Sequence, residues 1–265
     1  MKKKDAWHLL TAGVGSADMR AASVRIFDRA SSSGLFESVN AVNNDNLAQM
    51  CSRVVTAYPQ IFNGETRGFG YMTYKADAIV SAFENSWGSC DGVVWIDAGC
   101  ELFLTPITRI RFKYFLRVAK KRGIACFELG TPEIHYTKKL LFDKFPSINP
   151  KDSGDQIQST WFIAHGELGR KVVEEWLSMV LESEDNFNLL ESPQGEFPEF
   201  VEHRYDQSIF SLVCKANGIR PMKLKPTPGI GSWITLCRSF FHPIWTSRNR
   251  KGDSSIPRGF RYFET

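Results

Sequence analysis

A short apolar run that ends at an acidic residue is the feature that most constrains the fold. Gly92–Ile96 reads GVVWI, and Asp97 follows it directly. A run of this length is typical of a buried strand. Thr105 and Pro106 come next, an N-cap residue and a proline at the first helical position, so we expect a helix to about Arg122. A buried strand followed by a helix indicates an α/β protein.

The rest of the chain repeats this alternation. Further strands are predicted over Trp7–Ala12, Glu37–Val42, Ile124–Glu128 and Ile157–Ala164. Further helices are predicted over Ala21–Ala30, Asn46–Ala57, Thr73–Trp87, Leu168–Leu181 and Asp206–Asn217. Gln60–Gly70 and Glu182–Glu202 have the composition of loops. We therefore expect a mostly parallel central sheet flanked by helices, with ligands beyond the carboxyl ends of the strands.

Length and composition set the class of protein. The 265 residues suffice for one large domain or two small ones, and 43% are hydrophobic and 23% charged, as in ordinary globular chains. The start, MKKKDAWHLLTAGVG, lacks the long apolar region of a signal peptide, and no run of about 18 apolar residues occurs. Six cysteines form no CxxC pair. We expect a cytoplasmic protein with buried, reduced thiols.

The charge is unevenly distributed. Residues 215–265 hold ten Lys or Arg and two acids, whereas the preceding residues hold 23 basic and 27 acidic groups. Such a segment suits an anionic partner, which is a nucleotide diphosphate, an acidic membrane surface or nucleic acid, although a solvated basic surface would have the same composition. We divide the chain into a body, 1–237, and a basic aromatic segment, 238–265, that closes over the site or contacts a membrane.

Two candidate sites follow predicted strands. TAGVGSAD, after the first strand, contains a G-x-G, but Asp18 stands where a dinucleotide-binding fingerprint has Gly or Ala. This turn either lets the backbone approach a nucleotide or simply joins strand to helix. Asp97 is placed to bind a divalent metal, or to serve as a turn acid. Because GxxxxGK[ST] is absent from the sequence, a P-loop enzyme is excluded.

Two more candidates lie near the carboxyl terminus. Asp206 and Gln207 open a predicted helix, where amide donors favour anions, although an acid is common at any helix start. His242 lies in FFHP, just before Arg248 and Arg250. A neutral imidazole is a good metal ligand, although a lone histidine is more often structural, and arginine forks bind diphosphate oxygens.

Taken in order, these segments resemble glycosyltransferases of the GT-A fold, especially small bacterial enzymes that assemble capsule, lipopolysaccharide or O-antigen. DGVVWIDAGCELF is similar to their "LYLDAG" strand, and GFGYMTYKADAIVSAF to the helix before it. IQSTWFIAHG and HRYDQSIFS resemble the "NAGVLLIN" strand and "DQ" helix of the glycogenin and lipopolysaccharide-galactosyltransferase group. FFHPIWTSRNR lies where those enzymes have a metal-binding histidine. The resemblance extends from Tyr71 to Arg250.

The resemblance implies a nucleotide-sugar donor, with a UDP-sugar favoured, and an acceptor hydroxyl on a glycan or lipid-linked acceptor. It also implies a divalent metal, Mn or Mg. Asp97 matches the first acid of the DxD motif, but Gly99 replaces the second. Either Glu101 substitutes for it, or the metal is weakly held or replaced by cationic side chains.

The other roles implied by the resemblance concern the donor and the metal. His242 would complete the metal site, and Gln158, Asp206 and Gln207 would face the donor sugar. The nucleotide diphosphate would contact Thr11, Ala12, Gly13, Lys75, Arg248 and Arg250. The large electrostatic task in such chemistry is to stabilise the departing diphosphate.

The stereochemistry and the acceptor stay open. A retaining enzyme needs no strong base, because the leaving phosphate can take the acceptor proton. An inverting enzyme needs a carboxylate base, for which Glu128, Glu133 and the acids of Glu182–Glu202 are candidates. That acidic loop, with Phe187, Phe197 and Phe200, either covers an acceptor sugar or is an ordinary surface loop.

Two rival functions remain. A nucleic-acid-binding protein would use the basic carboxyl-terminal segment, but the sequence has no recognised RNA- or DNA-binding motif. A catalytically silent scaffold of the same fold would explain Gly99. Release of a nucleoside diphosphate from a nucleotide sugar distinguishes the enzyme from both.

Overall fold

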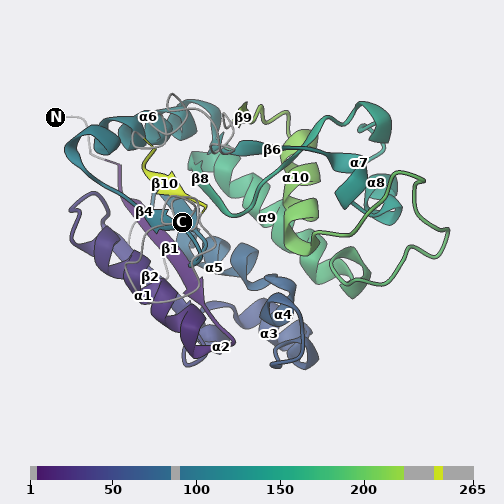
Figure 1. Ribbon diagram of the computed structural model, residues 1–265, viewed down its shortest axis with the longest axis horizontal. Helices are drawn as coiled ribbons and strands as arrows, with labels where there is room; N and C mark the ends of the chain where they lie inside the picture. Colours follow the sequence, from purple (N-terminus) through teal and green to yellow (C-terminus); the bar gives the residue numbers. More distant parts are fainter. Residues whose placement is uncertain (1–4, 85–89, 224–241, 247–265) are drawn as a thin grey trace, which may run out of the picture.

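A five-stranded sheet forms the centre of the protein. The structure is a computed structural model, and it describes residues 5–84, 90–223 and 242–246. The strand order is β2-β1-β3-β8-β5, and β1, β2 and β8 of this sheet are labelled in Figure 1. The strands are β1 (Trp7–Gly13), β2 (Ser38–Asn43), β3 (Gly92–Ile96), β5 (Ile124–Ala125) and β8 (Trp161–His165). Only β8 of these five runs against the others, since it pairs antiparallel with β3 and β5. The predicted mostly parallel α/β architecture is therefore confirmed.

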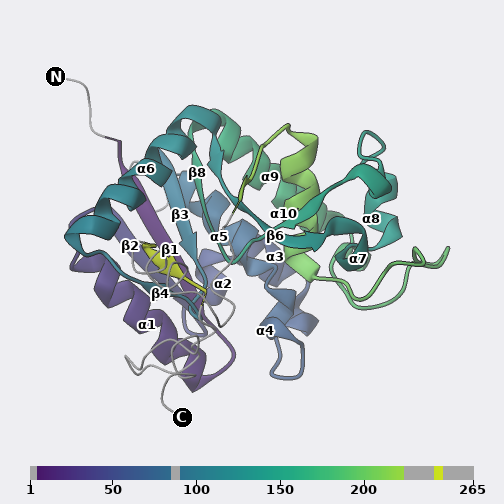
Figure 2. The ribbon, with the colours of Figure 1, turned by 45° about the horizontal axis from the view of Figure 1, so that its top comes forward.

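Helices cover both faces of this sheet (Figure 2). Two pack on one face, α1 (Ala17–Ser31) and α6 (Pro106–Arg122). The opposite face carries α2 (Leu47–Met50), α3 (Ser52–Ala57), α5 (Tyr74–Phe83), α9 (Gly166–Glu182) and α10 (Tyr205–Ala216). Successive residues of β3 alternate between two hydrophobic cores, with Val93 and Trp95 in one and Val94 and Ile96 in the other. This alternation follows from the two-residue period of a strand.

Smaller elements surround the main layers. The short strands are β4 (Glu101–Leu102), β6 (Phe127–Pro132), β7 (Asp155–Ile157), β9 (Met222–Lys223) and β10 (Ile244–Trp245). The remaining helices are α4 (Gly68–Tyr71), α7 (Glu133–Tyr136), α8 (Lys139–Lys144), and the 3₁₀ turns η1 (Pro59–Ile61), η2 (Pro150–Asp152) and η3 (Glu184–Asn186). A second sheet has the order β7-β6-β9, and β10 pairs with β4.

Two predicted strands are each divided between the two sheets. The predicted Ile124–Glu128 becomes β5 in the central sheet and β6 in the second sheet. The predicted Ile157–Ala164 likewise becomes β7 and β8. Between β7 and β8, the backbone of Gln158 donates to Phe127 and that of Thr160 accepts from Asp97. These crossing residues satisfy their hydrogen bonds with neighbouring segments, so the apolar pattern continues although the sheet changes.

Other boundaries differ from the expected ones. The helix predicted over Asn46–Ala57 is broken at Cys51, whose φ and ψ of −131° and 42° are not helical. The loop predicted over Gln60–Gly70 includes η1 and the start of α4, and the sequence pattern did not indicate α7 or α8. The α6 helix has the predicted start and end. The proposed division at 237/238 lies outside the described residues, as does Cys237.

The described cysteines are unpaired, and four of the five are buried. Within the described ranges, none of the helices has the length and hydropathy needed to cross a bilayer.

Candidate functional site

A lysine ammonium joins two carboxylates at the carboxyl end of the central sheet. Lys75 lies in the first turn of α5, Asp97 directly after β3, and Asp206 in the first turn of α10. Lys75 Nζ lies 3.1 Å from Asp97 Oδ1 and 3.1 Å from Asp206 Oδ2. The side chains of Lys75 and Asp206 are 2% and 3% exposed, whereas that of Asp97 is 22% exposed. Solvent therefore reaches this group of charges through Asp97.

Two neutral donors hold the carboxylates in place. The indole Nε1 of Trp95 donates to Asp97 Oδ1 at 2.7 Å, since residues two apart in a strand face the same side. Ser159 Oγ donates to Asp206 Oδ2 at 2.9 Å and lies 3.4 Å from Lys75 Nζ. We call Lys75, Asp97, Ser159 and Asp206 the carboxylate–lysine cluster. Neither Trp95 nor Ser159 was predicted, although the two-residue spacing from Trp95 to Asp97 is visible in the sequence.

Burial and charge oppose each other within the cluster. Burial raises the pKa of Asp206 to about 6, because the attraction of Lys75 offsets only part of the desolvation and Asp97 adds repulsion. Burial alone would lower the pKa of Lys75, but Asp206 and Asp97 outweigh it and the pKa is raised. Lys75 therefore stays protonated at neutral pH. Asp206 loses its proton at a pH slightly below neutral, near its pKa of about 6.

An amide network extends from the cluster into the protein. Gln207 Oε1 accepts from the Ser159 backbone N–H at 3.4 Å, and Gln207 Nε2 donates to Gln156 Oε1 at 2.7 Å. Gln158 is 1% exposed, and its Nε2 has no hydrogen-bond partner among the residues described. A buried amide without a partner is costly, so Gln158 Nε2 is an unsatisfied donor directly before Ser159 of the cluster. The predicted residues thus lie on two neighbouring stretches of chain, with Gln158 between β7 and β8 and with Asp206 and Gln207 on α10.

The structure places Glu133, one of the candidate bases, where an acceptor cannot reach it. Glu133 is fully buried, and its carboxylate accepts from Thr137 at 2.5 Å, from Gln156 at 3.2 Å and from Lys215 at 2.6 Å. Ser211 donates to it as well. A carboxylate enclosed in this way supports the local packing of α7 and α10 and is not accessible to an acceptor. Glu128 is 21% exposed and remains a candidate.

The end of β1 has a close packing contact. A Cβ on Gly13 would lie 2.3 Å from both Met19 O and Ser23 Oγ of α1, so only glycine lets α1 approach the strand. Of the two readings of this turn, the strand-to-helix junction accounts for Gly13. Thr11 is fully buried and its hydroxyl has no partner within the described ranges. Contact of Thr11, Ala12 and Gly13 with a nucleotide stays a prediction.

The three predicted metal ligands are not brought together. Glu101 lies on β4 and pairs with Arg25, at 3.3 Å, and with Arg29, both from α1. His242 packs on the rings of Phe115 and Trp161, on the sheet face opposite the cluster. Its Nδ1 lies 2.9 Å from Ile244 O. Burial and Arg111 lower the pKa of His242 to about 4, so its imidazole is neutral at pH 7.

Among the described residues, those around Asp97 do not by themselves form a set of ligands for a divalent cation. The ammonium of Lys75 already lies between the two carboxylates. No group of three His, Cys, Asp or Glu gathers as a metal site in the part of the chain described. The metal remains a prediction from the resemblance. Arg248 and Arg250 lie outside the described residues.

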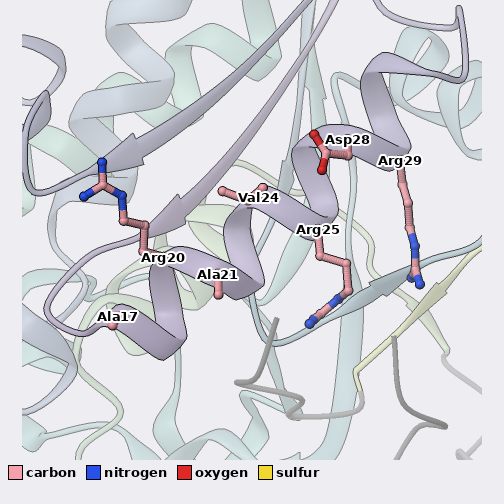
Figure 3. Close-up of a pocket in the computed structure, with 7 residues that line it drawn as sticks. All are labelled: Ala17, Arg20, Ala21, Val24, Arg25, Asp28 and Arg29. Atoms are coloured by element: carbon pink, nitrogen blue, oxygen red, sulfur yellow. The ribbon is translucent and has the colours of Figure 1, made fainter. Parts of the chain in front are cut away.

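A separate depression of about 600 Å³ lies along α1 (Figure 3). Its lining residues are Ala17, Arg20, Ala21, Val24, Arg25, Asp28 and Arg29. Arg25 also donates to the carbonyls of Ala98 and Cys100, both at 3.2 Å. The arginines of α1 thus secure the turn after Asp97. The depression includes none of the cluster residues, and we assign the site by the convergence of charged groups.

Strained backbone borders the cluster. Phe69, Tyr71 and Met72, just before α5, have φ of 49°, 52° and 60°, and Tyr205, just before Asp206, has φ of 44°. The rings of Tyr71 and Tyr205 lie 5.4 Å apart. Non-glycine residues adopt positive φ at a cost, and such residues are enriched at functional sites. No local sequence pattern indicated these positive φ values at non-glycine residues.

No family model matches the sequence, and no curated protein matches it. Among solved structures, the chain is similar to mouse xyloside xylosyltransferase 1 in its apo form, with a TM-score of 0.47 and 13% identity over 95% of this chain and 96% of that one. It is also similar to the apo WbbM bifunctional glycosyltransferase, with a TM-score of 0.44 and 10% identity over 92% of this chain and 46% of that one. At these values, neither similarity decides the activity.

Proposed function

We propose that this protein is a glycosyltransferase, which moves a sugar from a nucleotide-diphosphate donor to an acceptor hydroxyl. One observation carries the proposal. The resemblance assigns Lys75, Asp97 and Asp206 to donor phosphate, donor binding and the sugar, and both carboxylates lie 3.1 Å from the Lys75 ammonium at the carboxyl end of the sheet. In open α/β sheets this edge is where ligands bind.

The cluster suits the electrostatics of sugar transfer. When the bond between the anomeric carbon and the phosphate oxygen breaks, the diphosphate gains negative charge and the sugar becomes oxocarbenium-like. A preorganised ammonium, Lys75, favours the first change, and the carboxylate of Asp206 favours the second. The amides of Gln158 and Gln207 supply hydrogen bonds for sugar hydroxyls. In this proposal, residues of the protein supply both the charges and the hydrogen bonds that sugar transfer needs.

The finer parts of the proposal rest on the resemblance. We assign a UDP-sugar as donor, a glycan or lipid-linked hydroxyl as acceptor, and a role in bacterial surface polysaccharide synthesis. We also assign retention of configuration, in which the leaving phosphate takes the acceptor proton. The enclosure of Glu133 supports this, because it removes one of the carboxylates that an inverting reaction could use.

A second candidate is a catalytically silent protein that binds a nucleotide sugar. Two observations favour it. Gly99 stands where the DxD motif has its second acid. Glu101, the acid that would replace it, is held by Arg25 and Arg29.

Release of nucleoside diphosphate tests the proposal. The purified protein is incubated with UDP-, GDP- and TDP-linked sugars and a panel of glycan acceptors, and the released nucleoside diphosphate is measured by chromatography. We expect Asp97→Asn to lower the rate at least about 100-fold, because a preorganised charge is lost at the reacting centre. Asp91→Asn is the matched control at the other end of β3, where Asp91 accepts from the Ala6 backbone at 2.8 Å. It should keep the wild-type rate.

The outcomes separate the two candidates. If wild-type protein binds a nucleotide sugar but releases no diphosphate with any acceptor, the silent protein is supported. If Asp97→Asn retains the wild-type rate, the carboxylate–lysine cluster is not the site of transfer.

A further inference from the structure

Helix α6 carries an unusual concentration of positive charge. Its sequence, PITRIRFKYFLRVAKKR, has seven basic residues and no acidic one. Two of the seven are held by residues outside the helix, while Arg111 lies over the ring of Phe115 and Arg117 donates to the Lys113 carbonyl, both within the helix. Arg109 donates to the carbonyls of Leu104 and Ser33, and Lys120 pairs with Asp5 at 2.7 Å. The other five are exposed, and none has an acidic partner in the part of the chain described: Arg111, Lys113, Arg117, Lys121 and Arg122.

Large apolar side chains lie among these charges. Ile107, Ile110 and Tyr114 are 57%, 68% and 52% exposed. Their spacing of three and four residues places them on one side of the helix. The buried residues, such as Phe112 and Leu116, occupy the opposite side and pack on the sheet. We call Ile107, Ile110, Tyr114 and these five exposed cations the α6 outer face.

We propose that the α6 outer face binds the surface of an anionic phospholipid bilayer. Exposed isoleucines and a tyrosine surrounded by lysine and arginine are the composition of helices that lie in the membrane interface. The cations attract acidic headgroups, while the apolar side chains leave water for the acyl boundary. A nucleic acid would satisfy the cations but would leave both isoleucines in water.

The position of α6 suits this role. It runs along the outside of the molecule, on the sheet face opposite α5 and α10 (Figures 1 and 2). The carboxylate–lysine cluster is built from the other face, so contact with a bilayer through α6 leaves the cluster residues untouched. The proposal concerns a different surface from the carboxyl-terminal segment considered from the sequence, and it does not depend on the proposed function.

Vesicle co-sedimentation of the full chain tests the proposal. The probes are unilamellar vesicles of phosphatidylcholine alone, and of phosphatidylcholine with phosphatidylglycerol. We expect binding to the second kind only, and weaker binding at high salt because exposed charges are screened.

Two double variants separate the contributions of charge and apolar area. Lys113→Glu with Arg117→Glu should weaken binding at least about 25-fold, since one cation near an anionic bilayer contributes about fivefold. Ile110→Ser with Tyr114→Ser keeps every charge and should weaken binding at least about tenfold, since each buried CH₂ contributes about fourfold.

Matched controls change other surfaces by the same chemistry. Arg170→Glu with Lys171→Glu makes the same change of charge on α9, where both residues pair with glutamates one turn on. Leu190→Ser removes an apolar side chain that is 70% exposed, close to the 68% of Ile110. Both controls should bind vesicles as the wild type does. Circular dichroism and thermal midpoints show whether each variant is folded.

The vesicle-binding results of the wild type and the variants either support or overturn the proposal. Binding to anionic vesicles that both α6 variants weaken and both controls retain supports the proposal. The proposal is overturned if wild-type protein binds no vesicle, or if folded α6 variants bind as the wild type does. The binding of an oligonucleotide is measured in the same way. If Lys113→Glu with Arg117→Glu weakens oligonucleotide binding and leaves vesicle binding unchanged, the α6 outer face binds nucleic acid and the proposal is overturned.

Discussion

Single residues decide the chemistry through their burial. Lys75 and Asp206 are among the most buried charged groups of the structure, and each is compensated by the other. Removing one partner of such a pair leaves an uncompensated charge in a medium of low dielectric, which costs several kcal/mol. Asp97 differs because it is partly exposed, so it alone of the two carboxylates can meet a ligand from solvent without first being uncovered.

The raised pKa of Asp206 predicts a dependence of activity on pH. The proposed role requires the carboxylate, so the rate of transfer should rise with pH through about 6. In Asp206→Asn this rise should be absent from the remaining activity. The measurement is kcat/KM for donor cleavage between about pH 4.5 and 8, a range set by the pH profile expected of a single acid. An unchanged rise in the variant would assign it to another group.

Stability should vary over the same range with the opposite sign. The folded protein holds the proton of Asp206 more tightly than the unfolded chain, because the pKa is raised from 3.8 to about 6. This group therefore makes the folded state less stable as the pH rises from about 4 to about 6, since ionisation is easier in the unfolded chain. Thermal midpoints of wild type and Asp206→Asn across this window provide an independent check.

At the scale of elements, the distance between β1 and α1 depends on Gly13. A methyl group there would lie 2.3 Å from Met19 O, a backbone atom that cannot move without shifting the helix. The same helix supplies Arg25, which donates to two carbonyls in the turn after Asp97. The packing of α1 therefore supports the edge of the sheet where the site lies.

Gly13→Ala is expected to lower the free energy of unfolding by about 1–3 kcal/mol, as overpacking of a closely packed contact does. Urea denaturation measures the change. Gly64→Ala is the matched control, because a Cβ at Gly64 would meet nothing within 4 Å. Its effect should stay within about 0.5 kcal/mol. Equal stabilities of the two variants would contradict the tight contact.

At the scale of the whole molecule, the site exists only because distant segments meet. Lys75 and Asp97 are 22 residues apart, and Ser159 and Asp206 are 47 apart. A ligand that binds the folded cluster and not the unfolded chain raises the stability of the entire domain. The increase is about 2.7 kcal/mol when the ligand is at 100 times its Kd.

A thermal-shift panel with UDP, GDP, CMP and TDP tests this coupling and the role of a metal. We expect one nucleotide to raise the thermal midpoint, and the shift to persist in EDTA, because Lys75 already occupies the space between the carboxylates. A shift that disappears in EDTA and returns with Mn²⁺ would instead support the metal predicted from the DxD resemblance. Asp97→Asn should lose the shift in either case.

The sequence alone determined the class of fold and most of its elements. Gly92–Ile96 and the Thr105-Pro106 helix start are local signals, because strand burial and helix capping depend on residues close together in the chain. The same reasoning drew attention to Asp97 and Asp206, since an acid at the end of a strand or the start of a helix is visible without a structure. It also placed Lys75 in the predicted helix before the central strand.

Only the tertiary structure decided which of these residues act together. It placed Lys75 between two carboxylates, enclosed Glu133, and gave Glu101 to the arginines of α1. It also divided the predicted strand Ile157–Ala164 between two sheets, which brought Ser159 to Asp206. Sequence patterns report the periodicity of one element at a time, whereas burial, pairing and pKa depend on side chains that other elements bring into contact.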